Sequence, residues 1–226
     1  TNTDTELIVN LYQYKGIDCL NDLNGMFAFA IYDLEKKELF IGRDRFGIKP
    51  IYFFFDNKQF IFASELKAML LHTEIDKNIS ADSIDLFLTM EYIPSPLTIF
   101  KKINKLDQGH YLIFSNQNKL IKKKWYKFSY HPKIILESEN DYIERLDFLI
   151  AKSIKARTLS DVPYGCFLSG GLDSSLISYY LSEISQNKIK TFNIAFNDSS
   201  FDESEYASFV SKHLGTDHYS EMFSSD

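Results

Sequence analysis

The chain has 226 residues, 45% of them hydrophobic, and a formal net charge of −6 at pH 7. This composition predicts a folded globular protein of one large or two smaller domains. The acidic balance disfavours nucleic acid as a partner, since that affinity needs clustered Lys and Arg. No apolar run approaches the roughly 20 residues of a membrane helix, and no signal peptide opens the chain. We therefore expect a cytoplasmic protein without a membrane partner.

The first half begins with a helix and continues with strands. Thr3 to Glu6 has the Thr-x-x-Glu form of a capping box, so a helix should start near Asp4. A period of two then predicts an antiparallel meander with strands over 27–34, 38–43, 51–55 and 59–63. Further on, we expect helices over 65–71 and 80–90, and strands over 99–114 and 120–128.

A charged connection lies between two of these strands. Residues 42–52, with the sequence Gly-Arg-Asp-Arg-Phe-Gly-Ile-Lys-Pro-Ile-Tyr, crowd charges and glycines into a short loop. An arginine and a carboxylate in such a loop can form a fork that fixes a turn without doing chemistry. We expect an Arg–Asp ion pair that braces the loop.

The second half follows a polar stretch, 130–140, which is the best candidate for a linker. An amphipathic helix should reach Arg157, because Ile143, Leu146 and Leu149 recur at helical spacing. Beyond it, strand, helix, strand, helix and strand alternate, which predicts a parallel sheet. A ligand would then lie at the carboxyl ends of the strands.

The turn after the strand 162–168 carries anion-binding groups. It reads Ser169-Gly170-Gly171-Leu172-Asp173-Ser174-Ser175 and opens a helix. Glycines let backbone N–H groups approach a phosphate, and the helix N-terminus favours negative charge. No lysine is present, so this is not a Walker loop, and Asp173 argues for Mg²⁺ between the carboxylate and the phosphates. The alternative is an ordinary helix start with Asp173 placed for the macrodipole and a serine as cap.

This turn resembles the pyrophosphate loop of the ATP pyrophosphatases, and residues 159–165 before it resemble glutamine-hydrolysing asparagine synthetases of the B type. Residues 23–30, 42–52 and 63–68 resemble the glutaminase domains of N-terminal-nucleophile amidotransferases. The resemblance covers essentially the whole chain. It implies an internal fragment with a partial α+β glutaminase of the N-terminal-nucleophile hydrolase type over 1–129, a linker over 130–140, and a partial α/β Rossmann-like ATP pyrophosphatase domain over 141–226.

The resemblance also assigns residues. Asp4 matches the aspartate that holds the α-amino group of glutamine. The alternative is that it is an ordinary acidic residue in the first turn of a helix, where it stabilises the helix dipole. Asp173 is the expected Mg²⁺ ligand. Ile194 should face the adenine, unless it is an ordinary buried strand residue. The expected ATP and pyrophosphate site consists of Leu168, Ser169, Gly170, Gly171, Asp173, Ser174, Ser175 and Ile194.

The family nucleophile, a cysteine at the mature amino terminus, has no counterpart in this sequence. Cys19 and Cys166 are the only cysteines, and their positions predict inert buried thiols. Thr1 does not replace the nucleophile, because the match places it deep inside the domain. We therefore expect no catalytic residue of the glutaminase here and no glutamine hydrolysis by this chain alone.

The implied activity is glutamine-dependent asparagine synthesis with ATP and Mg²⁺ as cofactors. Aspartate is adenylated on its side-chain carboxylate and amidated with ammonia from glutamine, which gives asparagine, glutamate, AMP and pyrophosphate. The expected partners are these small molecules, and a homodimer is also considered. Three alternatives stay open: a related enzyme that amidates or cyclises another carboxylate, a tRNA-modifying pyrophosphatase, and a truncated, non-catalytic nucleotide-binding remnant.

Overall fold

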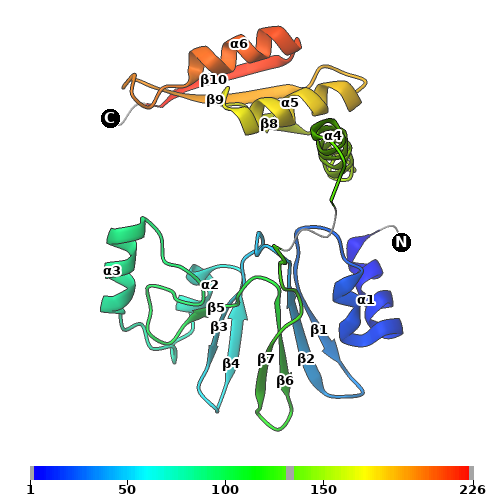
Figure 1. The fold of residues 1–226 in the computed structure, drawn as a ribbon. Helices are drawn as coiled ribbons and strands as arrows, with labels where there is room; N and C mark the ends of the chain where they lie inside the picture. Colours follow the sequence, from blue (N-terminus) through cyan, green and yellow to red (C-terminus); the bar gives the residue numbers. More distant parts are fainter. Residues whose placement is uncertain (1–2, 131–134, 224–226) are drawn as a thin grey trace. The chain divides into compact units, whose positions relative to one another are not determined.

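The computed structural model describes residues 3–130 and 135–223. The chain divides into two compact units, Thr1–His131 and Pro132–Asp226, which are treated separately here (Figure 1). The division falls inside the linker predicted over 130–140. Thr1 and part of that linker lie outside the described residues.

The first unit opens with the expected capped helix. Helix α1 spans Asp4–Lys15, and the side chain of its N-cap Thr3 accepts a hydrogen bond from the Glu6 N–H at 3.4 Å. A short 3₁₀ helix, η1, covers Gly16–Asn21 and buries Cys19 and Leu20 completely. These helices form one layer of the unit, and apolar side chains of both pack on the core.

Two antiparallel sheets follow in place of the predicted single meander, which is wrong. The strands of the first sheet, in spatial order, are β1 (Ala28–Asp33), β2 (Glu38–Arg43), β6 (His110–Ser115) and β7 (Leu120–Lys124). Those of the second sheet are β4 (Phe60–Ala63), β3 (Tyr52–Phe55) and β5 (Asn104–Lys105). Strand β2 pairs with β6, not with β3, because both faces of β2 are apolar and β3 and β4 cover one of them.

The unit has four layers, α-β-β-α. Phe40 of β2 packs with Cys19 and Leu20 on the helical side of the first sheet. Its neighbour Ile41 packs on the opposite side with Phe53 of the second sheet. The far face of that second sheet packs on helix α2, Leu66–Leu70. Successive residues of one strand therefore belong to two different cores, as the pleat requires.

Two other predictions for this unit hold in part. Helix α3 spans Ala81–Met90 and is capped by Ser80, as expected. The predicted strand over 99–114 was too long, because only β5 and β6 form there. Strand β7 pairs with β6 as predicted but ends at Lys124.

The second unit contains a parallel sheet, as its alternating pattern predicted. Strands β9 and β10 pair in parallel, and β8 pairs in parallel with the other edge of β9. The elements in chain order are α4 (Glu139–Lys155), β8 (Gly165–Phe167), α5 (Leu172–Ile184), β9 (Lys190–Phe196), α6 (Ser204–Leu214) and β10 (Asp217–Phe223) (Figure 1). Strand β8 is shorter than the predicted 162–168.

One face of this sheet packs on α5 and α6, and the other is open among the described residues. The Cys166 Sγ contacts the Ser178 Oγ of α5, and the neighbouring Thr191 contacts Thr216, which follows α6. The inward side chains of β9 are buried, whereas those of Phe192, Ile194 and Phe196 are exposed. No helix among the described residues is long and apolar enough to cross a membrane.

Candidate functional site

The predicted phosphate loop lies at the carboxyl edge of the parallel sheet. Leu168 is buried, and its N–H donates to the carbonyl of Phe192 at 2.8 Å. Since Phe167 is paired with Phe192, Ser169 and Ile194 lie at the same level, two residues further along each strand. The structure thus brings the predicted loop residues and Ile194 to one edge, where open α/β sheets bind ligands.

Serine hydroxyls hold the shape of the loop. The Oγ atoms of Ser169 and Ser174 lie 2.9 Å apart, and the Ser169 N–H donates to the Ser174 Oγ at 3.2 Å. The Gly171 N–H donates to the Ser169 Oγ at 3.3 Å. In the structure these hydroxyls bond one another and the backbone. They fix the loop that presents other donors.

Gly170 is the one loop position that requires glycine. Its φ of +82° lies in the left-handed region that favours glycine. A Cβ at this position would lie 2.4 Å from the Cβ of Tyr206 and 2.8 Å from the backbone N of Ala207. The first turn of α6 therefore packs directly against the loop.

The helix start next to the loop has free N–H groups. Gly171 is the N-cap of α5 and makes no side-chain capping bond. The Ser175 N–H donates to the Gly171 carbonyl at 3.0 Å, so the N–H groups of residues 172–174 precede the first helical bond. Such a helix N-terminus attracts anions through its N–H groups and its macrodipole.

Asp173 stands in this first turn and is exposed. Among the described residues its carboxylate has no hydrogen-bond or ion-pair partner. Magnesium is commonly held by one or two carboxylates together with substrate phosphates. The described residues contain no group of three or more acidic, histidine or cysteine side chains suited to a metal. The donor set thus fits a cation held jointly by Asp173 and phosphate oxygens.

Ser175 and Ile194 are placed differently from one another. Ser175 lines an apolar groove of about 310 Å³ between α5 and α6, and its Oγ is buried without a partner. Ile194 lies on the open face of the sheet with 51% of its surface exposed, so the alternative of a buried strand residue is wrong. It lines a cavity of about 730 Å³ together with Phe167, Phe192 and Tyr219.

Asp4, the predicted glutamine-binding residue, is the first residue of α1 and is exposed. It lies in the first unit, which also contains the charged loop over 42–52. The carboxylate of that loop does not form the expected ion pair. Instead, the buried carboxylate of Asp44 accepts the N–H groups of Phe46, Ile48 and Lys49 at 3.0–3.1 Å.

Arg43 also bonds backbone atoms. Its guanidinium donates to the carbonyls of Lys49, Gly47 and Leu106, and burial lowers its pKa. The Arg–Asp ion pair expected in this loop is therefore wrong for Arg43 and Asp44. A tight loop offers many backbone partners, which satisfy both buried charges without a direct pair.

Cys19 is buried as expected, whereas Cys166 is half-buried. Burial raises the pKa of Cys19, and it likewise raises the pKa of Cys166. Since the thiolate is the nucleophile, a raised pKa lowers reactivity near neutral pH.

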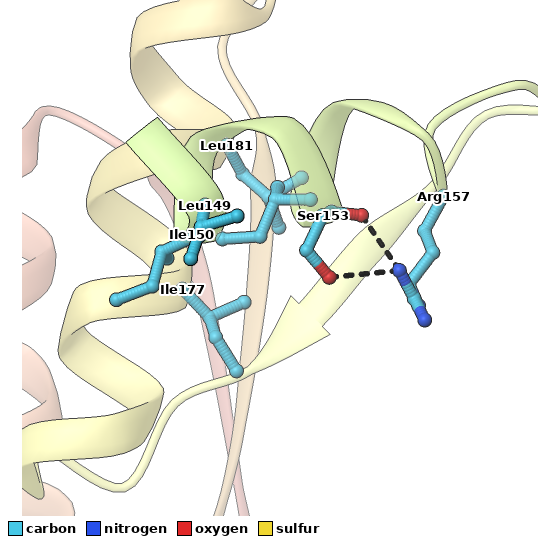
Figure 2. A pocket seen from close by; sticks show the side chains of 7 residues that line it. Leu149, Ile150, Ser153, Arg157, Ile177 and Leu181 are labelled. Atoms are coloured by element: carbon cyan, nitrogen blue, oxygen red, sulfur yellow. Dashed lines mark hydrogen bonds between the residues drawn. The ribbon is translucent and has the colours of Figure 1, made fainter. Parts of the chain in front are cut away.

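A further cavity in the second unit does not suit a phosphate. It measures about 520 Å³, lies between α4 and α5, and is lined mainly by apolar side chains such as Leu149, Ile150 and Ile177 (Figure 2). Its polar groups bond each other, because the Arg157 guanidinium donates to the carbonyl and Oγ of Ser153 at 2.8 Å (Figure 2).

One buried polar residue beside the loop escaped the sequence reasoning. Asn193 lies in β9 and donates to the Leu168 carbonyl. The available signal was an amide between the apolar residues Phe192 and Ile194. The alternation of apolar residues in this strand would have placed Asn193 outside, whereas the structure places it inside.

Comparison with known proteins identifies both units. Residues 1–126 match the family model described as "Glutamine amidotransferase domain", and residues 145–226 match the one described as "Asparagine synthase". The chain therefore belongs to the glutamine amidotransferase family. Several curated relatives are named glutamine-hydrolysing asparagine synthetases.

Curated relatives of that name align over nearly the whole chain. A putative asparagine synthetase 2 of Methanocaldococcus jannaschii is 40% identical over 99% of this chain and 44% of its own length. Asparagine synthetase 1 of Bacillus subtilis is 30% identical over 99% of this chain and 35% of its own. Asparagine synthetase B of Escherichia coli is 31% identical over 97% of this chain and 36% of its own. The chain spans less than half the length of each.

Among solved structures, a B. subtilis glutamine phosphoribosylpyrophosphate amidotransferase aligns with 14% identity and a TM-score of 0.35. The alignment covers 97% of this chain and 39% of that one.

Proposed function

We propose that this chain contributes the nucleotide loop of a glutamine-dependent asparagine synthetase, together with part of its glutaminase domain. The observation that carries the proposal is the loop over 168–175 at the carboxyl edge of a parallel sheet. It presents uncapped N–H groups and Asp173, which has no partner within the part of the chain that the structure describes. The names of the relatives support aspartate as the acid and glutamine as the nitrogen source.

In the proposed reaction, an oxygen of the aspartate side-chain carboxylate attacks the α-phosphorus of ATP. The bond to the bridging oxygen breaks and pyrophosphate leaves, so the carboxylate becomes an acyl adenylate. Ammonia then attacks the acyl carbon, AMP leaves with the bonding electrons, and loss of a proton from nitrogen gives the amide. Catalysis of this kind relies mainly on positioning and charge stabilisation.

The residues of this chain would divide that work. The N–H groups at the start of α5 would receive the pyrophosphate, and Asp173 would hold Mg²⁺, which neutralises the charge that develops on the leaving group. Ile194 would lie against the adenine. In the first unit, Asp4 would bind the α-amino group of glutamine, the source of ammonia.

Binding of Mg·ATP by the purified chain tests the nucleotide loop. ATP with Mg²⁺ should raise the melting temperature, because a ligand that binds only the native state stabilises it. Asp173→Asn should lose most of this shift, whereas Glu183→Gln, an exposed carboxylate in the last turn of the same helix, should keep it. Equal shifts in both variants would refute the role of Asp173.

Turnover tests the reaction. The protein in its native full length should form asparagine and AMP in equal amounts from glutamine, aspartate and ATP. Asp173→Asn should lower that rate by about a hundredfold or more. AMP formation with another carboxylic acid, but not with aspartate, would instead assign a related amidotransferase. ATP binding without turnover on any acid would identify a non-catalytic remnant.

A further inference from the structure

Asn193 occupies an unusual place in the parallel sheet. It lies on the inward side of β9 between the buried residues Thr191 and Ala195, and only 8% of its surface is exposed. A buried amide destabilises a fold unless its donors and acceptor find partners. Its retention here therefore depends on the bonds that it makes.

Those bonds connect the middle of β9 to the middle of β10 and to the residue that follows β8. The Asn193 Nδ2 donates to the Leu168 carbonyl, which follows β8, at 3.3 Å. The Ser220 hydroxyl of β10 donates to the Asn193 Oδ1 at 3.2 Å. Since a carbonyl only accepts, the amide nitrogen must face Leu168 and the amide oxygen must face Ser220.

The Leu168 carbonyl belongs to the peptide that begins the loop. The same peptide carries the Ser169 N–H, which donates to the Ser174 Oγ at 3.2 Å. Because a peptide group is planar, bonds at its oxygen and at its nitrogen together fix its orientation. Asn193 supplies the first of these bonds from the sheet, and Ser174 supplies the second from the helix.

We propose that Asn193 is a positioning residue for the nucleotide loop: its amide orients the Leu168–Ser169 peptide and so keeps the loop in its ligand-binding shape. The part of this role that concerns ATP rests on the proposed function. The orientation of the loop itself does not, and the two can be measured apart.

Two isosteric variants separate this role from general stability. Asn193→Leu removes the amide but keeps its approximate volume. Thr191→Val is the matched control, because Thr191 is buried on the same side of β9 and its hydroxyl bonds Thr216 and His218, not the loop. Melting temperatures show how much each change costs the fold. Where Asn193→Leu fails to fold, Asn193→Asp serves in its place.

Hydrogen exchange of the Ser169 and Gly171 amides reports on the loop without any ligand. We expect exchange about fivefold faster or more in Asn193→Leu, and rates close to wild type in Thr191→Val. The affinity for Mg·ATP should fall about three- to tenfold in Asn193→Leu only. Loop exchange that is the same in both variants, after allowance for their melting temperatures, would overturn the proposal.

Asn193→Asp adds a test by rescue. An ionised carboxylate repels the Leu168 carbonyl, whereas a protonated one carries an O–H donor. Loop protection relative to wild type should therefore be low when the carboxylate is ionised and recover as falling pH protonates it, beginning above the ordinary pKa of about 3.9 because burial disfavours the charge. The absence of any recovery in a variant that remains folded would contradict a bond to Leu168. If wild-type protein binds no Mg·ATP, the proposed function fails, and loop exchange still decides the role of Asn193.

Discussion

The hydroxyl oxygens of Ser169 and Ser174 lie 2.9 Å apart and join the end of a strand to the first turn of the following helix. Ser174 also accepts the Ser169 N–H and contacts the Gly171 carbonyl at 3.2 Å. One side chain thus closes the loop on itself. A ligand that binds this loop meets groups whose positions are already fixed, which lowers the entropic cost of binding.

Replacing Ser174 should open that closure. Ser174→Ala removes an acceptor and a donor, so we expect the affinity for Mg·ATP to fall about three- to tenfold with little change in the helix. Ser182→Ala is the control, since the Ser182 hydroxyl donates to the Tyr179 carbonyl of the same helix and bonds no loop residue among those described. Titration calorimetry would measure both, and equal affinities would contradict the bracing role.

The two loop glycines should respond differently to alanine. Gly170→Ala places a Cβ against Tyr206 at positive φ and should cost about 1–3 kcal/mol of unfolding free energy. At Gly171 a Cβ would meet only the Ser169 Oγ at 3.4 Å, an ordinary contact, so Gly171→Ala should leave the fold close to wild type. Denaturant unfolding of both variants checks the difference, and comparable losses would show that the contact with α6 is unimportant.

Asp44 should matter to the stability of the first unit. Asp44→Asn leaves an N–H group of the 46–49 loop without its acceptor, which should cost about 1–3 kcal/mol because the site is buried. Asp56→Asn is the matched change, as the exposed Asp56 accepts the N–H groups of Lys58 and Gln59 at 3.0 Å. Urea unfolding should show a clearly smaller loss for Asp56→Asn.

Asp33 should make the stability of the first unit depend on pH in the acid range. Hydrogen bonds from the backbone and side chain of Lys36, with a further bond from Tyr12, lower its pKa from 3.8 to about 2. A lowered pKa means that the ionised carboxylate stabilises the fold above pH 3.8. This contribution is lost as pH falls through about 2.

The comparison of wild type with Asp33→Asn measures this effect. Wild type should melt higher at neutral pH, and the difference should shrink as pH falls from 3.8 towards 2. A difference between wild type and Asp33→Asn that stays constant with pH would contradict the assignment.

Local signals in the sequence predicted the second unit well. The alternation of apolar runs with glycine turns identified its parallel sheet, because each β-α-β step is encoded within a short stretch of chain. The position of Ser169 at the strand end followed from the same pattern. The ligand roles of the loop residues and of Asp4 stay predictions.

The strand pairings of the first unit were harder to predict from the sequence. Strand β2 pairs with β6, whose residues lie some seventy positions away, and no local pattern specifies such a partner. The roles of Arg43 and Asp44 were misjudged for a related reason. Opposite charges are visible in a sequence, whereas the backbone groups that a folded loop turns towards them are not.

Trp125 gives the two units different optical properties. It is the only tryptophan of the sequence, its indole N–H donates to the Arg43 carbonyl at 3.1 Å, and the Arg45 guanidinium lies over its ring. Its fluorescence emission therefore reports the unfolding of the first unit, whereas tyrosines contribute in both. Fluorescence excited at a wavelength that tryptophan absorbs and tyrosine does not would follow the first unit alone. Compared with circular dichroism of the same sample, it would show whether the two units melt together or one after the other.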